Sequence, residues 1–256
     1  MPELPDIEVF TFNLNQQFAG KKLTKATVIL GKKLKDKPTE IVKALEGQTL
    51  EKIYRSGKEL RFKFSNGLLM GMHLMLTGDI YPFEKKNEHR STIVEFLFKD
   101  GSGLALTDRM KNANIKLNPV DKDGVDALSK ELNYKYLKSV FQRKANIKSI
   151  LLDQDIIRGI GNGYSDEILW ETKISPFSVA EAIPDEKIKE LPKTIKKVLS
   201  SATKKILKSH PGLTTGEVKD YLRIHRRKES PTGYEIHVDQ KGSRKTYYTD
   251  EQVVYE

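Results

Sequence analysis

The sequence predicts an α+β protein of two domains, with a strand-rich N-terminal half and a helical C-terminal half that ends in a hairpin. Its 256 residues exceed the about 100 to 150 that one domain commonly uses. Apolar residues alternate with polar ones from about residue 22 to 118, and later recur every three or four residues. A polar, turn-rich stretch at 119–124 separates the two patterns, so we expect the domain boundary there.

The chain begins with a predicted helix. Ile7, Phe10, Leu14 and Phe18 recur at spacings of three and four, which places them on one helical face. Gly20 follows and can end the helix before the basic pair that comes next. We therefore expect one helix ahead of the first strand.

The strand-rich region is predicted to form antiparallel sheets. Leu60, Phe62 and Phe64 alternate with charged residues, and Asn66-Gly67 then provides a tight turn. Asp100-Gly101 predicts a second hairpin. Such alternation is typical of sheets with one buried face, which favours a sandwich or barrel over a doubly wound fold.

The later part of the chain is predicted to be helical. Helical patterns cover about 124–138, 146–154, 163–173 and 185–208, and alternation returns from Pro231 to Glu256. The expected organisation is a β-sandwich domain at 1–118, a linker at 119–132, a helical domain at 133–230 and a terminal hairpin at 231–256.

Charge and cysteine content limit the classes of function. The net charge of +10 and the pI near 9.4 favour a polyanionic partner, nucleic acid first and an anionic membrane second. No apolar run is long enough to span a membrane, and no secretion signal is recognisable. The absence of cysteine excludes disulfides, thiol catalysis and thiolate zinc sites, and the histidines show no metal-binding spacing.

The N-terminus is a candidate reactive group. Removal of Met1 from the opening Met1-Pro2-Glu3-Leu4-Pro5 leaves Pro2 as a free secondary amine, which attacks carbonyl-type carbons and forms iminium intermediates. Glu3, one residue away, is a carboxylic acid able to move protons. If Met1 is retained, Pro2 nitrogen is an amide without nucleophilic character. In the alternative interpretation the two prolines only stiffen the chain before the helix.

This opening resembles the formamidopyrimidine-DNA glycosylase and endonuclease VIII family, whose members begin P-E-L/G-P-E and use the proline as nucleophile. Asp6 stands where the family usually has Glu. The resemblance implies a base-excision-repair DNA glycosylase with AP lyase activity that works through a proline Schiff base. It further implies a cytoplasmic, nucleoid-associated monomer of bacterial type that binds damaged double-stranded DNA without a metal or organic cofactor.

A second motif joins two predicted helices through the segment 157–167, which reads IRGIGNGYSDE. Glycines let backbone amides approach a ligand closely, and a helix N-terminus favours an anion, so this geometry suits a phosphate. The segment resembles the helix-two-turn-helix element of the same family, G-I/V-G-N-x-Y-x-x-E. The resemblance implies that Asn162 contacts a DNA phosphate and that Lys148, the lysine of the preceding helix, also binds DNA.

Two further segments resemble family motifs near the lesion. In Ser56-Gly57-Lys58-Glu59-Leu60, Lys58 matches the lysine of the family's R/G-x-K-Y/H-L, which implies a place for Lys58 in the catalytic site, whereas Glu59 does not match the usual aromatic or His residue. Residues 73–78 resemble H-L-x-M-S/T-G, whose Met enters the space left by an everted base; Leu76 stands at that Met. The alternative interpretation of both segments is ordinary turn and strand structure.

The segment 107–113, TDRMKNA, departs from the family pattern T-D-P-R-R-F-G. Lys111 is a partial replacement for the arginine that faces the orphaned base, whereas Asn112 cannot stack as the family's Phe does. This departure from the family pattern affects how the protein probes a duplex and which opposite base it prefers, more than whether it binds DNA.

The last hairpin resembles a zinc finger that has lost its metal ligands. Gly242 to Thr249 is similar to the family's G-x-R-x-T-x-Y-C, and Thr249 and Gln252 stand where the later cysteines would be. We therefore expect a zincless finger that carries Arg244 toward the minor groove. An isolated hairpin is marginally stable, so the aromatic pair 247–248 and the valines 253–254 should pack on the helical domain.

Two interpretations remain open beside the enzyme. A member that has lost catalysis would bind damaged duplex without forming a trappable adduct. A basic RNA-binding protein would prefer structured RNA, although it leaves Pro2-Glu3 unexplained.

The basic cluster at 223–228 resembles the mobile loop that closes over the everted base in parts of the family, and we expect it to contact phosphate.

Overall fold

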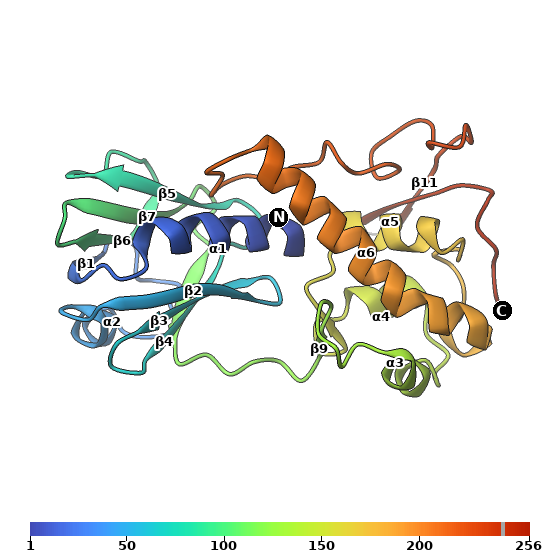
Figure 1. Cartoon of the computed structure of the whole chain (residues 1–256), viewed down its shortest axis with the longest axis horizontal. Helices are drawn as coiled ribbons and strands as arrows, with labels where there is room; N and C mark the ends of the chain where they lie inside the picture. Colours follow the sequence, from blue (N-terminus) through green and yellow to red (C-terminus); the bar gives the residue numbers. More distant parts are fainter. Residues whose placement is uncertain (242–243) are drawn as a thin grey trace. The chain divides into compact units, whose positions relative to one another are not determined.

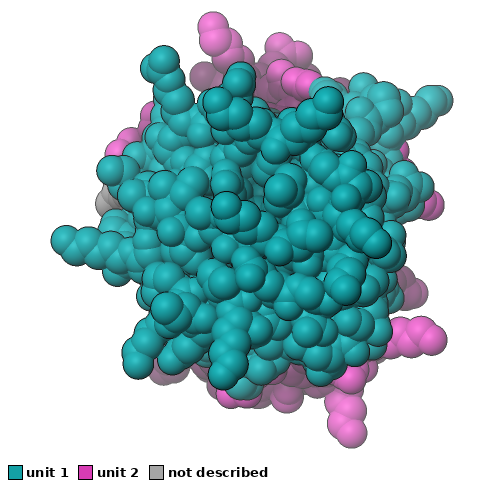
Figure 2. Space-filling model, turned by 90° about the vertical axis from the view of Figure 1, so that its left-hand side faces the viewer, with its two compact units in different colours: residues 1–121, 206–217 teal, residues 122–205, 218–256 magenta. Residues whose placement is uncertain are grey.

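The computed structural model describes residues 1–241 and 244–256 (Figure 1). Gly242 and Ser243, the first two residues of the predicted finger motif, lie outside the described residues. The chain forms two compact units: unit 1 contains 1–121 and 206–217, and unit 2 contains 122–205 and 218–256, drawn teal and magenta in Figure 2. The predicted two-domain α+β class is confirmed.

Unit 1 begins with helix α1, Leu4–Phe18. Its N-cap is Glu3, whose amide donates to Asp6 Oδ2 at 3.0 Å in a capping box, and Pro5 occupies the first turn where no amide donor is needed. The helix ends before Gly20, which adopts a left-handed φ of 86°. The predicted buried face is confirmed at residues Ile7, Phe10, Leu14 and Phe18.

Two four-stranded antiparallel sheets follow (Figure 1). One has the order β2-β3-β4-β8, with strands Leu50–Ser56, Glu59–Phe64, Leu69–His73 and Asn114–Leu117. The other has the order β1-β6-β7-β5, with strands Leu23–Val28, Thr92–Phe98, Ser102–Asp108 and Gly78–Glu84. Both predicted tight turns are present, with φ of 80° at Gly67 and 87° at Gly101.

The sequence patterns missed helix α2, Pro38–Leu45, inside the region expected to hold only strands. Proline in its first turn favours helix initiation, and Ile41 and Leu45 are fully buried four residues apart. A helix of two turns shows too few apolar repeats to be distinguished from a strand.

Unit 2 contains the predicted helices at shifted bounds. They are α3 Tyr134–Val140, α4 Ile147–Leu152, α5 Asn162–Glu171 and α6 Asp185–Ser209, with a short 3₁₀ helix, η1, at Ala180–Ala182. The residues of α6 from 206 onward belong to unit 1. The helix predicted over 124–138 was wrong in its first ten residues. β9, Val125–Asp126, pairs in parallel with β10, Ile157–Arg158, and α3 starts only after the side chain of Asn133 caps it. None of the described helices is long and apolar enough to cross a membrane.

The terminal hairpin consists of β11, His237–Lys241, and β12, Arg244–Tyr248. Tyr247 packs against the buried cluster of Trp170, Ile224 and Ile236, so the expected docking of the hairpin on the helical unit is confirmed there. The expectation for the two valines was wrong, because the Val253 and Val254 side chains are about half exposed. Val253 joins the unit through its backbone, which hydrogen-bonds Lys173 and Ser175.

Candidate active site and nucleic-acid interface

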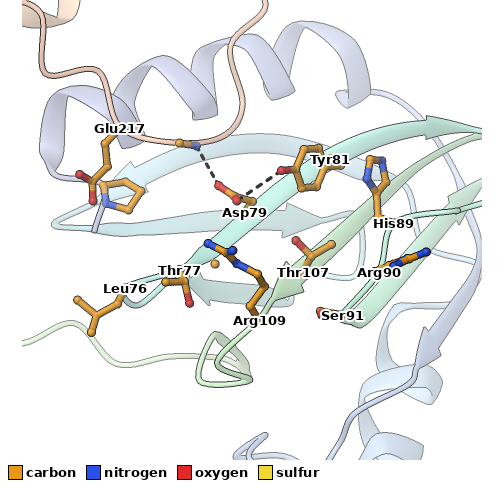
Figure 3. A pocket seen from close by; sticks show the side chains of 13 residues that line it. Leu76, Thr77, Asp79, Tyr81, His89, Arg90, Ser91, Thr107, Arg109 and Glu217 are labelled. Atoms are coloured by element: carbon orange, nitrogen blue, oxygen red, sulfur yellow. Dashed lines mark hydrogen bonds between the residues drawn. The ribbon is translucent and has the colours of Figure 1, made fainter.

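A cavity of about 700 Å³ opens in unit 1 beside Pro2 (Figure 3). Pro2 and Glu217 form one part of its wall. The remaining lining comes from β5, the end of β7, the segments that adjoin them, the segment before β6 and the residue before Glu217: Leu76, Thr77, Gly78, Asp79, Tyr81, His89, Arg90, Ser91, Thr107, Arg109 and Gly216. The cavity therefore combines two arginines with carboxylates and aromatic rings around the predicted nucleophile.

Pro2 is buried and precedes Glu3, the N-cap whose capping box fixes the start of α1. The ammonium group of Met1 forms an ion pair with the carboxylate of Glu217. Removal of Met1 would transfer the free amine to a residue that already lines the cavity. The described lining includes Pro2 and Leu76 among the predicted site residues, and it includes neither Glu3 nor Lys58.

An aromatic stack and a carboxylate form a polar wall of the cavity (Figure 3). The rings of Tyr81 and His89 lie 4.2 Å apart and are nearly parallel. Asp79 Oδ1 accepts from the amide of Gly216 at 2.9 Å, and Oδ2 lies 3.5 Å from the Tyr81 hydroxyl. Burial and the adjacent Asp79 carboxylate raise the pKa of Tyr81, which keeps the hydroxyl protonated. Sequence reasoning missed this wall because its residues form no motif.

The buried carboxylate of Asp108 organises the loops at one end of this sheet. Its Oδ1 accepts from the Thr77 hydroxyl and from the amide of Met110, and its Oδ2 accepts from the amides of Asn112 and Ala113. Burial acts to raise the pKa of Asp108, but these four hydrogen bonds outweigh it and lower the pKa. Asp108 is therefore an ionised anchor for two neighbouring loops.

Lys111 lies in one of these loops with a left-handed φ of 55°. It lines a separate hollow of about 430 Å³ together with His89 and Ser91. The structure thus places it close to the cavity of Pro2, with which that hollow shares His89 and Ser91. Its contact with an orphaned base stays a prediction.

Lys58 occupies the turn between β2 and β3, where Gly57 has a φ of 59° and Ser56 pairs with Glu59. It lies near His73, at the end of β4. Burial is the main cause that lowers the pKa of His73, and the positive charge of Lys58 adds to this effect. His73 Nδ1 accepts from the amide of Met75 at 2.9 Å, so the imidazole is neutral. This lysine and histidine form a second polar group on unit 1.

Unit 2 carries a hollow of about 430 Å³ lined by Asn162, Arg244 and Lys148, three of the predicted DNA-binding residues. Arg244 is exposed on the first position of β12. Asn162 is half-buried at the start of α5 and donates to the backbone carbonyl of Lys245 at 2.9 Å. Its Oδ1 is buried and finds no hydrogen-bond partner among the described residues.

Lys148 differs from the other two because its side chain is buried. The ammonium donates to Asp166 Oδ1 at 2.6 Å and to Thr246 Oγ1 at 2.9 Å. Asp166 is itself fully buried, and its other oxygen lies 2.6 Å from His225 Nδ1. These contacts join α4, α5 and the hairpin through Lys148, whose binding to DNA stays a prediction.

The basic cluster at 223–228 is likewise attached to unit 2. The amides of Arg223, Ile224 and His225 donate to the carboxylate of Glu167, and the ring of His225 is buried. The start of the cluster therefore has the contacts of a packed segment rather than those expected of a mobile loop.

Comparison with known proteins identifies the family. The model of the formamidopyrimidine-DNA glycosylase N-terminal domain matches residues 1–115, and that of the formamidopyrimidine-DNA glycosylase H2TH domain matches 124–210. A formamidopyrimidine-DNA glycosylase of Lactobacillus gasseri is 36% identical over 217 residues, which cover 80% of this chain and 78% of that protein. The one from Mycoplasma genitalium is 31% identical over 255 residues, or 90% and 87% of the two chains. The chain belongs to the formamidopyrimidine-DNA glycosylase family.

Solved structures of formamidopyrimidine-DNA glycosylases share the fold. The Lactococcus lactis protein bound to DNA that contains an abasic site superposes with a TM-score of 0.87 at 22% identity, over 98% of this chain and 99% of that one. The same protein with DNA that contains N7-benzyl-Fapy-dG gives a TM-score of 0.85 at 23% identity and the same coverage. This formamidopyrimidine-DNA glycosylase family member is a base-excision DNA-repair enzyme.

The finger of this formamidopyrimidine-DNA glycosylase family member is held by hydrogen bonds at the positions where the resemblance places cysteines. The amide of Thr249 donates to Gln252 Oε1 at 2.9 Å, and Gln252 Nε2 donates to the carbonyl of Ile174 at 2.8 Å. Between them, Glu251 accepts from Trp170, Lys173 and Thr232. Within residues 1–241 and 244–256, no three His, Asp or Glu side chains are grouped to hold a metal ion.

Proposed function

We propose that this protein is a bifunctional DNA glycosylase and AP lyase that removes oxidised bases from double-stranded DNA with Pro2 as its nucleophile. The placement of Pro2 in the wall of a 700 Å³ cavity is the observation that best supports this activity. The bacterial relatives named above are formamidopyrimidine-DNA glycosylases, and the structural relatives are bound to abasic or modified DNA.

The proposed reaction proceeds through a covalent intermediate. The damaged base is turned out of the helix, and the Pro2 amine then attacks C1′ of its deoxyribose. A bond forms between nitrogen and C1′ while the glycosidic bond breaks, and the base leaves with the bonding electron pair and a proton. The nitrogen lone pair then breaks the C1′–O4′ bond and O4′ takes up a proton, which opens the sugar and gives an iminium. The iminium acidifies C2′, and loss of that proton expels the 3′ phosphate by β-elimination. A second elimination releases the 5′ phosphate.

The other predicted site residues have supporting roles. Glu3 moves protons to and from the sugar, since it is one residue from the nucleophile. Lys58 holds a phosphate beside the neutral His73. Asn162 and Arg244 bind the DNA backbone from the hollow of unit 2. Lys111 faces the orphaned base, and Leu76 enters the space that the everted base leaves. Lys148 supports Asn162 by fixing α4 to α5.

Borohydride trapping with substitutions at the first two mature positions tests this proposal. Duplexes that contain an abasic site, 8-oxoguanine or an oxidised pyrimidine are incubated with the protein and sodium borohydride, which reduces the iminium to a stable adduct. We expect an adduct with the unsubstituted protein. Pro2→Gly and Glu3→Gln should lose most trapping or turnover, and full activity in both variants would refute the assigned roles.

A damaged-DNA-binding protein without catalysis is the second candidate. It is favoured by Asp6, which replaces the usual Glu, and by Asn112, which replaces the aromatic wedge. It predicts affinity for damaged duplex with no borohydride adduct at any of the three lesions. The RNA-binding interpretation is not retained, because the two family domains match in order along the chain.

A further inference from the structure

We propose that Glu217 is a second catalytic carboxylate, which takes the proton from the Pro2 nitrogen while the covalent intermediate forms. This inference rests on the proposed function and deepens it, since it divides proton transfer between two acids. Glu217 acts at the nucleophile, and Glu3 acts at the sugar. No motif in the sequence pointed to Glu217, which lies more than two hundred residues from the N-terminus.

The ion pair of the Met1 ammonium shows where the mature amine will lie. Its partner is the carboxylate of Glu217, whose side chain is 20% exposed. Because a chain advances at most about 3.6 Å per residue, the Pro2 nitrogen is within one residue length of the ammonium that this carboxylate binds. Pro2 and Glu217 also line the same cavity (Figure 3). Loss of Met1 therefore leaves the carboxylate beside the new amine.

Hydrogen bonds fix the segment that carries Glu217. The side chain of Asn13 on α1 donates to the carbonyl of Leu213 at 2.8 Å. The hydroxyl of Thr214 donates to a backbone carbonyl of β5 at 2.9 Å, and the amide of Gly216 donates to the carboxylate of β5 described above. The segment is thus attached to the helix that begins at the nucleophile and to a strand that lines the cavity.

The reaction requires a base at the Pro2 nitrogen. Attack of a secondary amine on C1′ forms the N–C1′ bond and leaves a positively charged nitrogen that still carries its proton. This nitrogen has no lone pair with which to open the sugar until that proton leaves. Glu217 accepts the proton, and the freed lone pair can then break the C1′–O4′ bond. The proton passes from Glu217 to the departing base, which restores the carboxylate next to the positive charge of the iminium.

Glu217 is better placed for this step than Glu3, because it lines the cavity with Pro2 and Glu3 does not. Other ionisable groups surround the nucleophile. Glu3 and Asp6 lie at the start of α1, and the cavity is also lined by Asp79, Tyr81, His89, Arg90 and Arg109. All of them remain in a protein substituted only at position 217, so a comparison with the unsubstituted protein isolates Glu217.

Single-turnover trapping tests the catalytic role. Protein shown by intact mass to lack Met1 is mixed in excess with an abasic-site duplex and borohydride. Glu217→Gln keeps the shape of the side chain without its basicity, and general acid–base catalysis contributes about 10² to 10⁴-fold, so we expect adduct formation to slow by about a hundredfold. Duplex affinity, measured without borohydride, should not fall, whereas Glu217→Asp should recover part of the rate.

Chemical rescue separates proton transfer from a structural effect. Glu217→Ala opens space at the cavity wall, and added acetate should raise its rate of adduct formation at least several-fold. The same acetate should not accelerate Glu217→Gln, whose amide still fills the space. Glu84→Gln removes an exposed carboxylate at the end of β5 and is the matched control, which should react at the unsubstituted rate.

An NMR titration of the Pro2 amine needs no DNA chemistry. A neighbouring carboxylate favours the charged form of an amine, so the Glu217→Gln protein should release the Pro2 proton at lower pH than the unsubstituted protein. Labelled proline provides the signal, and both proteins are titrated without DNA. Glu84→Gln should titrate like the unsubstituted protein.

The two measurements distinguish failure of this inference from failure of the proposed function. Trapping by Glu217→Gln at the unsubstituted rate, or an unchanged titration of its Pro2 amine, would overturn the inference while the glycosylase function stood. If no protein forms an adduct but the amine titration still depends on Glu217, the catalytic function is refuted and the pairing of carboxylate with amine is supported. Absence of both effects would overturn both.

Discussion

The indole Nε1 of Trp170 donates to a carboxylate oxygen of Glu251 at 2.9 Å and joins α5 to the residues that follow the finger hairpin. The same carboxylate accepts from Lys173 at 2.6 Å and from Thr232 at 2.8 Å. Lys173 Nζ also lies over the Trp170 ring, 4.4 Å from its centroid. A set of charge-assisted hydrogen bonds thus stabilises the base of a finger that has no thiolate ligands.

Glu251→Gln is expected to destabilise the finger in a pH-dependent manner. Burial acts to raise the pKa of Glu251, but the hydrogen bonds from Lys173, Trp170 and Thr232 outweigh it and lower the pKa to about 2 from an ordinary value of 4.5. A lowered carboxyl pKa adds stability that is present above pH 4.5 and is lost as the pH falls toward 2. The difference in thermal unfolding midpoint between the two proteins should be largest at neutral pH and shrink over this interval. A difference that is constant with pH would contradict the assignment.

Lys148→Met is expected to destabilise unit 2 more than it weakens DNA binding. Removal of one partner from a buried ion pair leaves the other charge uncompensated, which costs about 3 to 5 kcal/mol. Here the charge left behind is that of Asp166, with His225 as its remaining side-chain partner in a hydrogen bond. Urea unfolding measures the loss. If stability is unchanged while DNA affinity falls, the ammonium contacts phosphate after all and the structural role is wrong.

Arg244→Ala is expected to weaken DNA binding more than it lowers the stability of unit 2. The arginine is exposed, so its loss should leave the unfolding free energy nearly unchanged. If it neutralises one phosphate, the slope of log affinity against log salt should become shallower by about 0.9. Titration of a labelled abasic duplex at several salt concentrations measures this slope. Lys204→Ala on α6, also exposed, is the charge-matched control and should leave the slope unchanged.

Local signals predicted much of the fold. The first helix and both tight turns follow from residues adjacent in sequence, and they were correct. The helix expected over 124–138 failed because Val125–Asp126 pairs with a strand more than thirty residues later. The residue pattern of one short segment does not show which distant segment it pairs with. Two buried residues in α2 were too few to establish a helical period.

The residues of the candidate site were predictable only where they belong to a recognised sequence motif. Pro2 and Leu76 line one cavity, and Asn162 and Arg244 line another, as sequence motifs indicated for residues far apart in the chain. The burial of Lys148 was not predictable, because it depends on Asp166 and on the fold of two helices around the pair. The anchoring role of Asp108 arises from loop geometry that a sequence pattern does not specify.

Mapping of the borohydride adduct tests the central claim most directly. The reduced protein-DNA adduct is digested, and mass spectrometry identifies the residue that carries the sugar, with intact mass measured on the same sample. We predict attachment at Pro2 in protein that has lost Met1. Attachment at a lysine such as Lys58, or incision by protein that still carries Met1, would contradict the assignment of Pro2 as nucleophile.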